Sequence, residues 1–308
     1  MGKVAILGIF VADCAFSSPR MPRTGETLIG TGFALGPGGK GSNQAVAAAR
    51  AGGEVSFITR IGRDTFGSIG LGLWKGAGVT PLVTEMEDVA TGAAFIYVND
   101  QTGENAIIVY PGASGHLSAA DVDGRRAAIA GADVFVTQLE QPADAALRGL
   151  QVAREAGVRT VFNPAPSVAF PDAVYPLCDI IAPNESEAEG LTGQTVATLE
   201  DARKAADILL ARGVGTVLIT LGERGALLHG GGTSRHFPAI PAGRVVDTTG
   251  AGDAFIGGFS VALSEGRALP DAVRFGSATA GLAVTRRGTA PAMPARAEID
   301  ALLAANPG

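Results

Sequence analysis

Short runs of apolar, β-branched residues alternate along the chain with Ala-rich stretches whose apolar positions have helical spacing. Near-continuous apolar runs, such as Val217–Thr220, are typical of strands covered on both faces. The alternation therefore predicts an α/β fold, with a parallel sheet and crossover helices on both of its faces. The predicted strands are residues 4–10, 55–62, 134–140, 160–166, 179–184 and 216–222, and the predicted helices are residues 43–51, 66–77, 143–156 and 199–212.

Polar residues fall where several of these strands are predicted to end. Ligands of parallel sheets bind at the carboxyl ends of the strands, because the loops there meet along one edge. We therefore expect one ligand-binding edge that includes Asp13, Glu140, Asn163, Asn184 and Gly222.

Two segments, residues 15–37 and 91–110, interrupt the alternation. In the second, GAAFIYVND and ENAIIVY flank a QTG turn, which is the pattern of a β-hairpin. Strands that leave a parallel sheet in this way can pair as a small flap over its ligand edge. An ordinary surface hairpin is the alternative.

Composition and charge narrow the class of partner. The 308 residues are 46% hydrophobic and 18% charged, with a formal net charge of −6 and no basic run, so neither nucleic acid nor a membrane surface is an expected partner. No apolar run reaches the ~18 residues needed to cross a bilayer. Cys14 and Cys178 lack any metal-binding spacing, so both are expected to be reduced thiols. Together with the lack of a membrane-spanning run, this predicts that the protein is cytoplasmic.

The sharpest motif is DTTGAGDAF, residues 247–255, followed by an apolar helical stretch at residues 256–263. Small residues at a helix amino terminus let backbone N–H groups approach an anion, so Gly250, Ala251 and Gly252 predict an anion hole. Asp253 lies at the start of the same helix, within reach of an attacking hydroxyl, and is the predicted catalytic base. The alternative is an acidic first-turn residue after a tight turn.

A second glycine-rich loop, GPGGKGSNQAVAAA, spans residues 36–49. Its glycines leave the backbone exposed beside Lys40 and Asn43, which offer donors to a polyhydroxylated ligand. A Walker phosphate loop is disfavoured because Gly41, not Ser or Thr, follows the lysine, and the dinucleotide fingerprint is disfavoured because no GxGxxG directly follows a strand.

Nearly end to end, the chain resembles the ribokinase-like PfkB family of sugar kinases. The resemblance implies one kinase domain over residues 1–308, with a doubly wound, mostly parallel sheet flanked by helices and a small β-sheet lid from about residues 14–37 and 91–110. It implies transfer of the γ-phosphoryl of ATP to a sugar, most of all D-ribose to give ribose 5-phosphate, with Mg²⁺, and a homodimer formed through the lid. The residues that carry it are the two loops above, NPAP at 163–166, PNESEAE at 183–189 and TLGERG at 220–225.

The resemblance also implies roles for individual residues. The sugar is expected to bind at Asp13, Gly39, Lys40, Asn43 and Glu140, with Asp253 as base. Taken alone, Asp13 or Glu140 is slightly better interpreted as a solvated charge at a strand end. The nucleotide is expected at Asn184, Thr220, Gly222, Gly225, Gly252 and Ser277.

Two metal sites are implied in the same way. Glu187 would bind Mg²⁺ through water, unless it is only part of an acidic helix start. A monovalent cation, K⁺, is expected at Asp247, Thr249, Ala283, Arg286, Gly288 and Ala292. The alternative is that no cation binds and Asp247 only caps a turn.

Two positions depart from the family pattern. Val11 stands where similar chains have Asn two residues before the aspartate, and Ala292 stands where they have Ser. Loss of the amide removes a hydrogen bond to the sugar, so another sugar, a sugar acid or a nucleoside is an alternative acceptor. From other classes, a nucleotide-dependent dehydratase with the same core and a sugar sensor without catalysis stay open.

Overall fold

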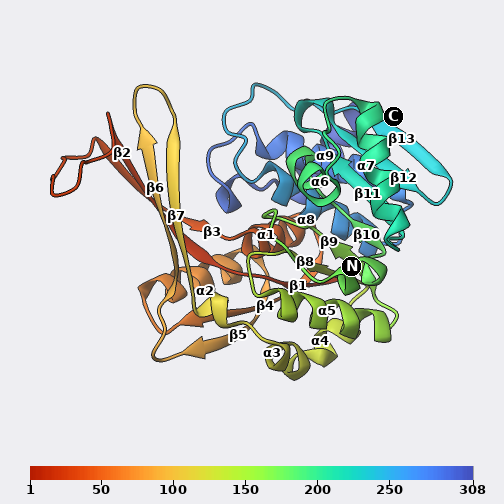
Figure 1. The fold of residues 1–308 in the computed structure, drawn as a ribbon, viewed down its shortest axis with the longest axis horizontal. Coiled ribbons are helices and arrows are strands. Elements are labelled where there is room, and N and C mark those ends of the chain that lie inside the picture. Colours follow the sequence, from red (N-terminus) through yellow and green to blue (C-terminus); the bar gives the residue numbers. More distant parts are fainter. Residues whose placement is uncertain (308) are drawn as a thin grey trace.

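In the computed structural model, residues 1–307 are described and form a nine-stranded sheet, a separate four-stranded sheet and the helices that cover the larger sheet (Figure 1). The strands are β1 (Lys3–Leu7), β2 (Val11–Ser18), β3 (Gly32–Gly38), β4 (Glu54–Gly62), β5 (Thr80–Met86), β6 (Thr91–Asn99), β7 (Asn105–Gly112), β8 (Val134–Thr137), β9 (Arg159–Phe162), β10 (Ile180–Ile181), β11 (Thr216–Thr220), β12 (Ala226–Gly230) and β13 (Thr233–Phe237). The α-helices are α1 (Lys40–Arg50), α2 (Thr65–Ala77), α3 (Ala119–Gly124), α4 (Arg126–Ala130), α5 (Ala143–Glu155), α6 (Glu185–Thr192), α7 (Leu199–Ala211), α8 (Ala251–Ser264), α9 (Leu269–Ala283) and α10 (Arg296–Ala305).

The large sheet has the order β13-β12-β11-β10-β9-β8-β1-β4-β5, and all its strands from β5 to β11 are parallel. From β1 the chain first builds outward through β4 and β5, and then returns to build the other side from β8. The sheet is therefore doubly wound, as predicted, with its switch point between β1 and β8. The antiparallel edge strands β12 and β13 were not predicted.

Two hydrophobic cores cover the two faces of this sheet. Val4 and Ile6 of β1 pack among residues of α1, α2, α8, α9 and α10, whereas Ala5 and Leu7 pack among residues of α3 to α7. Because successive side chains of a strand point to opposite faces, burial of both faces requires the continuous apolar runs seen in the sequence. Within residues 1–307, no helix is both long and apolar enough to span a bilayer.

Helices α1 and α8 lie unusually close together on one face. A Cβ atom on Gly257 of α8 would lie 2.5 Å from Cβ of Ala47 and 2.8 Å from the carbonyl oxygen of Gln44, both in α1. No side chain can stand between the helices at this point. Their amino termini consequently meet at the carboxyl edge of the sheet, where the candidate site lies.

The second sheet has the order β3-β2-β6-β7 and extends away from the helices as a long ribbon (Figure 1). The predicted hairpin is confirmed, since β6 and β7 pair antiparallel, and β2 and β3 form another. Asp13 was expected at the end of a strand of the large sheet, but it lies inside β2. The chain leaves the large sheet after Leu7, where Gly8 packs closely against Gly41. A Cβ atom on Gly8 would lie 2.7 Å from the Cα atom of Gly41.

Substituting Gly257 by Ala should force α1 and α8 apart and lower the free energy of unfolding by about 1–3 kcal/mol. Gly72 is the matched control, because it is exposed within α2 and a Cβ atom there meets nothing within 4 Å. Gly72→Ala should raise the free energy of unfolding by about 0.5–1 kcal/mol. Urea unfolding followed by circular dichroism measures both, and equal stability of the two variants would show that the helices are not in tight contact.

Candidate functional site

The predicted polar edge is present at the carboxyl ends of the parallel strands. Asn163 directly follows β9, Glu140 follows β8, Asn184 follows β10 and Gly222 follows β11, as expected. The site lies beside the switch point between β1 and β8, where loops from neighbouring strands turn in opposite directions and where ligands of such sheets bind.

Asp253 lies in the first turn of α8 and is 7% exposed. Its Oδ2 atom accepts a hydrogen bond from Nδ2 of Asn43 and its Oδ1 atom accepts one from Nε2 of Gln44, each at 3.1 Å. Burial raises the pKa of Asp253, while Lys40 and these two amides act in the opposite direction. The carboxylate is thus buried, oriented by both oxygens and close to a cation.

The amino terminus of α8 is open in front of Asp253. Gly250 begins the helix with φ 77°, a left-handed conformation that suits glycine, and a Cβ atom on Gly252 would meet nothing within 4 Å. The first N–H groups of a helix have no partner within it and carry the positive end of its dipole. Of the three predicted residues, Ala251 already donates its N–H to the carbonyl oxygen of Thr248 at 3.2 Å, which leaves Gly250 and Gly252 with the arrangement expected of an anion hole.

Lys40 is half-buried at the start of α1, and its backbone N–H donates to Oε2 of Glu140 at 2.7 Å. Burial lowers the pKa of Lys40, but the attraction of Asp253, Glu140 and Glu187 outweighs burial and raises it. The ammonium group therefore stays charged. Gly39 fixes this geometry, because with φ 89° its Cβ atom would lie 2.5 Å from the carbonyl oxygen of Ile9.

The two predicted sugar-binding acids, Asp13 and Glu140, are not freely solvated. Burial raises the pKa of Asp13 to about 6. Burial also raises the pKa of Glu140 to about 7, although the charge and the N–H group of Lys40 oppose it. Asp13 lies against Gly38, where a Cβ atom would be 2.5 Å from its Oδ2 atom. Glu140 lies close enough to Asp13, Lys40 and Asp253 for their charges to affect its pKa, so the structure brings both acids to the same site.

Asn184 and Glu187 form a reciprocal cap at the start of α6. Oδ1 of Asn184 accepts from the N–H of Glu187 at 2.8 Å, and Oε2 of Glu187 accepts from the N–H of Asn184 at 2.9 Å. Glu187 is 7% exposed, and burial raises its pKa. The helix-start alternative is therefore realised, yet Glu187 also lies close enough to Lys40 and Asp253 for their charges to affect it.

The other residues expected at the nucleotide lie in two places. The first is the loop after β11, where Thr220 bridges to Asn184, Gly222 has φ 56° with open space around it, and Gly225 has φ 93°. The second is α9, which contains Ser277. Ser277 is only 7% exposed, because α9 packs against α8.

Asp247 connects two segments of the expected cation site. Its Oδ1 atom accepts from the N–H of Thr249 and its Oδ2 atom from the N–H of Gly288, each at 2.9 Å. Burial acts to raise the pKa of Asp247, but these backbone donors outweigh it and hold the pKa below its usual range. Of the other predicted members, Ala283 and Ala292 are buried, and the Arg286 side chain turns away to Glu298, which leaves only backbone carbonyls for a cation.

Sequence reasoning assigned no role to two amide side chains, Gln44 and Gln138, of which Gln44 contacts Asp253. Gln44 donates to Asp253 and to Oδ1 of Asn163, and Gln138 donates to Gln44. One signal was available, since Gln44 lies four residues after Lys40 and thus on the same face of α1.

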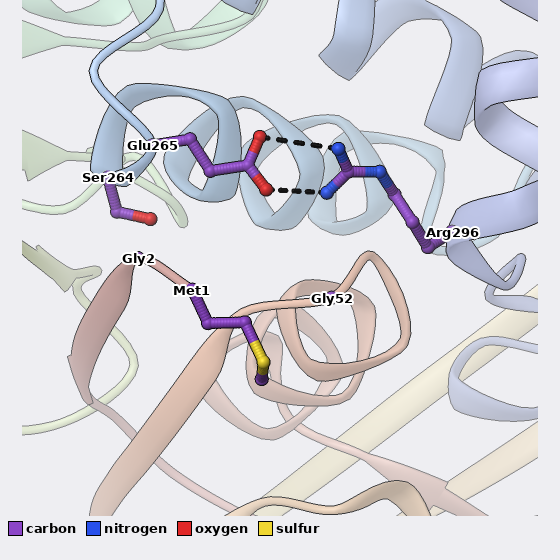
Figure 2. Close-up of a pocket in the computed structure, with 6 residues that line it drawn as sticks. All are labelled: Met1, Gly2, Gly52, Ser264, Glu265 and Arg296. Carbon is purple, nitrogen blue, oxygen red and sulfur yellow. Dashed lines mark hydrogen bonds and ion pairs between the residues drawn. The ribbon is translucent and has the colours of Figure 1, made fainter.

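A pocket of about 640 Å³ opens elsewhere, at Met1, Gly2, Gly52, Ser264, Glu265 and Arg296 (Figure 2). Ser264 ends α8, so this pocket lies at the opposite end of the helix that begins with the anion hole. Glu265 and Arg296, two of the residues that line it, form an ion pair whose closest atoms are 2.5 Å apart. None of the predicted site residues lines it.

Comparison with known proteins gives concordant matches. Residues 1–296 match the pfkB family of carbohydrate kinases. The ribokinase of Haemophilus influenzae is 41% identical over 296 residues, 96% of each chain, and the deoxyribokinase of Salmonella typhi is 33% identical over 305 residues, 98% of this chain and 99% of its own. The structure of Arabidopsis thaliana ribokinase complexed with ribose and ATP superposes with a TM-score of 0.91 at 31% identity, covering 98% of both chains.

The raised pKa of Glu140 predicts how stability depends on pH. Between its ordinary pKa of 4.5 and about 7, the folded chain binds a proton that the unfolded chain has lost, so the free energy of unfolding should fall as pH rises through this window. In Glu140→Gln the fall should be smaller, by up to about 3 kcal/mol. Urea unfolding at pH 4.5 and 8 measures it, with exposed Glu200→Gln as control. An unchanged fall in Glu140→Gln would exclude a raised pKa.

Proposed function

The chain belongs to the pfkB family of carbohydrate kinases, and we propose that it phosphorylates D-ribose to ribose 5-phosphate with ATP. One observation carries the proposal: Asp253 is a buried carboxylate, oriented by two amides, in the first turn of a helix whose amino terminus is open. Similarity to the ribokinases of H. influenzae and A. thaliana supports ribose as the acceptor and ATP as the donor.

In the proposed reaction, Asp253 accepts the proton of the attacking sugar hydroxyl. The N–H groups at Gly250 and Gly252 stabilise the charge on the transferred phosphoryl group. Lys40 opposes the effect of burial on Asp253, which keeps that carboxylate available as an acceptor. Asp13 and Glu140, together with Gly39 and Asn43, hold the sugar hydroxyls.

We place the nucleotide along the loop after β11, at Thr220, Gly222 and Gly225, with Asn184 and Ser277 beside it. Mg²⁺, when bound, would neutralise part of the charge on the phosphates. Glu187 fits an indirect ligand, because among the hydrogen bonds of residues 1–307 only its Oε2 atom is used, which leaves Oε1 for a metal-bound water.

We further propose that a monovalent cation, K⁺, binds beside the anion hole. Asp247 is held in its ionised form and joins Thr249 to Gly288, so a negative group stands at this loop. Carbonyl groups from residues 283 to 292 would complete the site. Such a cation would order the segment that precedes Gly250.

We assign the second sheet as a lid over the acceptor. Asp13 belongs to β2 of this sheet, so the sheet supplies one of the sugar-binding acids directly. Oγ1 of Thr289 donates to the carbonyl of Pro37 at 2.8 Å, which ties β3 to the loop next to the anion hole. Closure would exclude water that could otherwise accept the phosphoryl group.

Val11 makes 2-deoxyribose the second candidate acceptor. Val11 is 5% exposed and lies two residues before Asp13, so both side chains lie on the same face of β2. It presents methyl groups where an amide would bind a hydroxyl, and a sugar that lacks one hydroxyl loses less there. Similarity to the Salmonella deoxyribokinase supports this acceptor as well.

A dehydratase is disfavoured by the Lys40–Asn43 loop, and a sensor without catalysis is disfavoured by the intact Asp253.

We expect rapid ADP formation that depends on ribose, Mg²⁺ and K⁺, measured against a panel that includes 2-deoxyribose, a ketohexose and nucleosides. Asp253→Asn should lower kcat by at least about 100-fold, because the general base is lost, while sugar binding measured by calorimetry remains. Asp172→Asn, at an exposed position, is the control. Full activity of Asp253→Asn would remove Asp253 from the base role, and a preference for 2-deoxyribose would reassign the acceptor.

We propose that two copies of the chain pair through the outer face of the second sheet, the face opposite Asp13. Exposed apolar side chains form cross-strand neighbours there, including Phe33 beside Phe16 and Ile108 beside Phe95. Phe33 is 60% exposed and Ile108 is 67% exposed. A continuous apolar face of this kind on a chain without membrane spans in residues 1–307 is typical of a protein interface.

Ile108→Asp should convert the dimer to a monomer, because a charge would be buried in an apolar interface. Sedimentation velocity measures the change. Val168→Asp is the matched control, since Val168 is an exposed apolar residue outside the second sheet and its substitution should leave the dimer intact. A wild-type monomer at micromolar concentration would contradict the proposal.

We also assign the enzyme to the cytoplasm. Cys14 and Cys178 are both free thiols, which suits a reducing compartment, and ATP is available there.

A further inference from the structure

A chain of buried amides connects the loop after β8 to Asp253. Nε2 of Gln138 donates to Oε1 of Gln44 at 2.5 Å, and Nε2 of Gln44 donates to Oδ1 of Asp253 and Oδ1 of Asn163, each at 3.1 Å. Gln44 and Gln138 are fully buried. The proposed base is therefore in contact with a polar network that reaches across the switch point from α8 through α1 to β8.

The direction of every hydrogen bond that links Gln138, Gln44, Asn163 and Asp253 is fixed. An ionised carboxylate can only accept, so Gln44 must present its amino group to Asp253 and its oxygen to Gln138. Nδ2 of Asn163 donates to the carbonyl of Ala182 at 2.9 Å, which turns the oxygen of Asn163 toward Gln44. If Gln138 were rotated by half a turn, two amide oxygens would face each other.

The fold leaves room for Gln138 at a cost in stability. Its Oε1 atom lies only 2.4 Å from where a Cβ atom of Gly8 would be, and 3.1 Å from where a Cβ atom of Gly41 would be. Within residues 1–307 this oxygen has no hydrogen-bond partner. A buried, unpaired amide oxygen is unfavourable, and an apolar side chain of equal length would avoid it. The amide is thus better explained by its contact with Gln44 than by packing.

We propose that Gln44 is a positioning residue that orients the Asp253 carboxylate toward the acceptor hydroxyl, and that Gln138 acts through Gln44 by holding its amide in the required direction. The inference rests on the proposed function, in which Asp253 is the base. Asn43 and Gln44 each hold one carboxylate oxygen, so the plane of the carboxylate is set by two donors from adjacent positions of α1.

Loss of the Gln44 donor should also change the titration of Asp253. The charged groups that act around it are Lys40 on α1, Glu140 after β8 and Glu187 on α6, with Asp13 on β2 acting on Glu140. These remain when Gln44 is replaced. Because Gln44 favours the ionised carboxylate, its removal raises the pKa of Asp253 and moves the acidic limb of the kcat profile to higher pH.

The test compares Gln44→Met, Gln138→Met and the double variant, with KM for ribose and for ATP and the pH profile of kcat. We expect kcat to fall about 10- to 100-fold in Gln44→Met, corresponding to one hydrogen bond to a charged group, and about 3- to 10-fold in Gln138→Met, with both KM values within about twofold of wild type. The double variant should be no slower than Gln44→Met, because Gln138 acts only through Gln44.

Ser42→Ala is the matched control. Ser42 is fully buried on α1 and accepts a hydrogen bond from Trp74, but it does not touch Asp253. It should lose stability without loss of kcat. If Gln44→Met fails to fold, Gln138→Met decides, because Gln138 makes no contact with Asp253.

Full kcat with an unshifted acidic limb in Gln44→Met or Gln138→Met, measured beside an active wild type and an inactive Asp253→Asn, would overturn this inference alone. Independent, multiplying losses in the double variant would overturn the coupling through Gln44. A wild type that forms no ADP with any sugar would overturn the proposed function and this inference together.

Discussion

The candidate site depends on one ammonium group, that of Lys40, placed among buried carboxylates. Burial raises the pKa of Asp253, Glu140 and Glu187, and each of these shifts is opposed by Lys40. A charge pair separated by about 4 Å interacts by about 4 kcal/mol near a protein surface, which is enough to decide which of these groups is ionised at neutral pH. Without that cation, the pKa of Asp253 would be higher still, and the carboxylate would be a poorer acceptor of a proton from a sugar.

The fold positions this cation by backbone geometry. Gly39 adopts a left-handed conformation against Ile9, and Gly257 lets α8 approach α1 without an intervening side chain. The first turns of both helices then meet beside the switch point, where Asn43 and Gln44 contact Asp253. Burial elsewhere in the interior would disfavour an ionised carboxylate. Here the ionised form of Asp253 is stabilised by Lys40, by two amides and by the helix dipole.

The regular part of the fold was predictable from periodicity alone, because strands buried on both faces must be continuously apolar. The end of β1 was not, since residues 8–10 continue its apolar run and only the contact of Gly8 with Gly41 shows where the chain leaves the sheet. The edge strand Thr233–Phe237 is short and polar, so it lacks the signal of a buried strand.

The site was predictable where a motif places reactive groups at a helix start, as at Asp253 and Lys40. Gln44 and Gln138 were missed because their contact joins positions 94 residues apart, and neither amide carries chemistry that a sequence pattern reveals. The burial of Ser277 depends on how α9 packs against α8, which no local pattern encodes.

The most direct test of this account is a crystal structure of the protein with ribose and a non-hydrolysable ATP analogue. The account predicts that the acceptor hydroxyl lies within about 3.2 Å of a carboxylate oxygen of Asp253, with the terminal phosphate at the N–H groups of Gly250 and Gly252. A terminal phosphate bound away from the amino terminus of α8, or a sugar with no hydroxyl near Asp253, would contradict it.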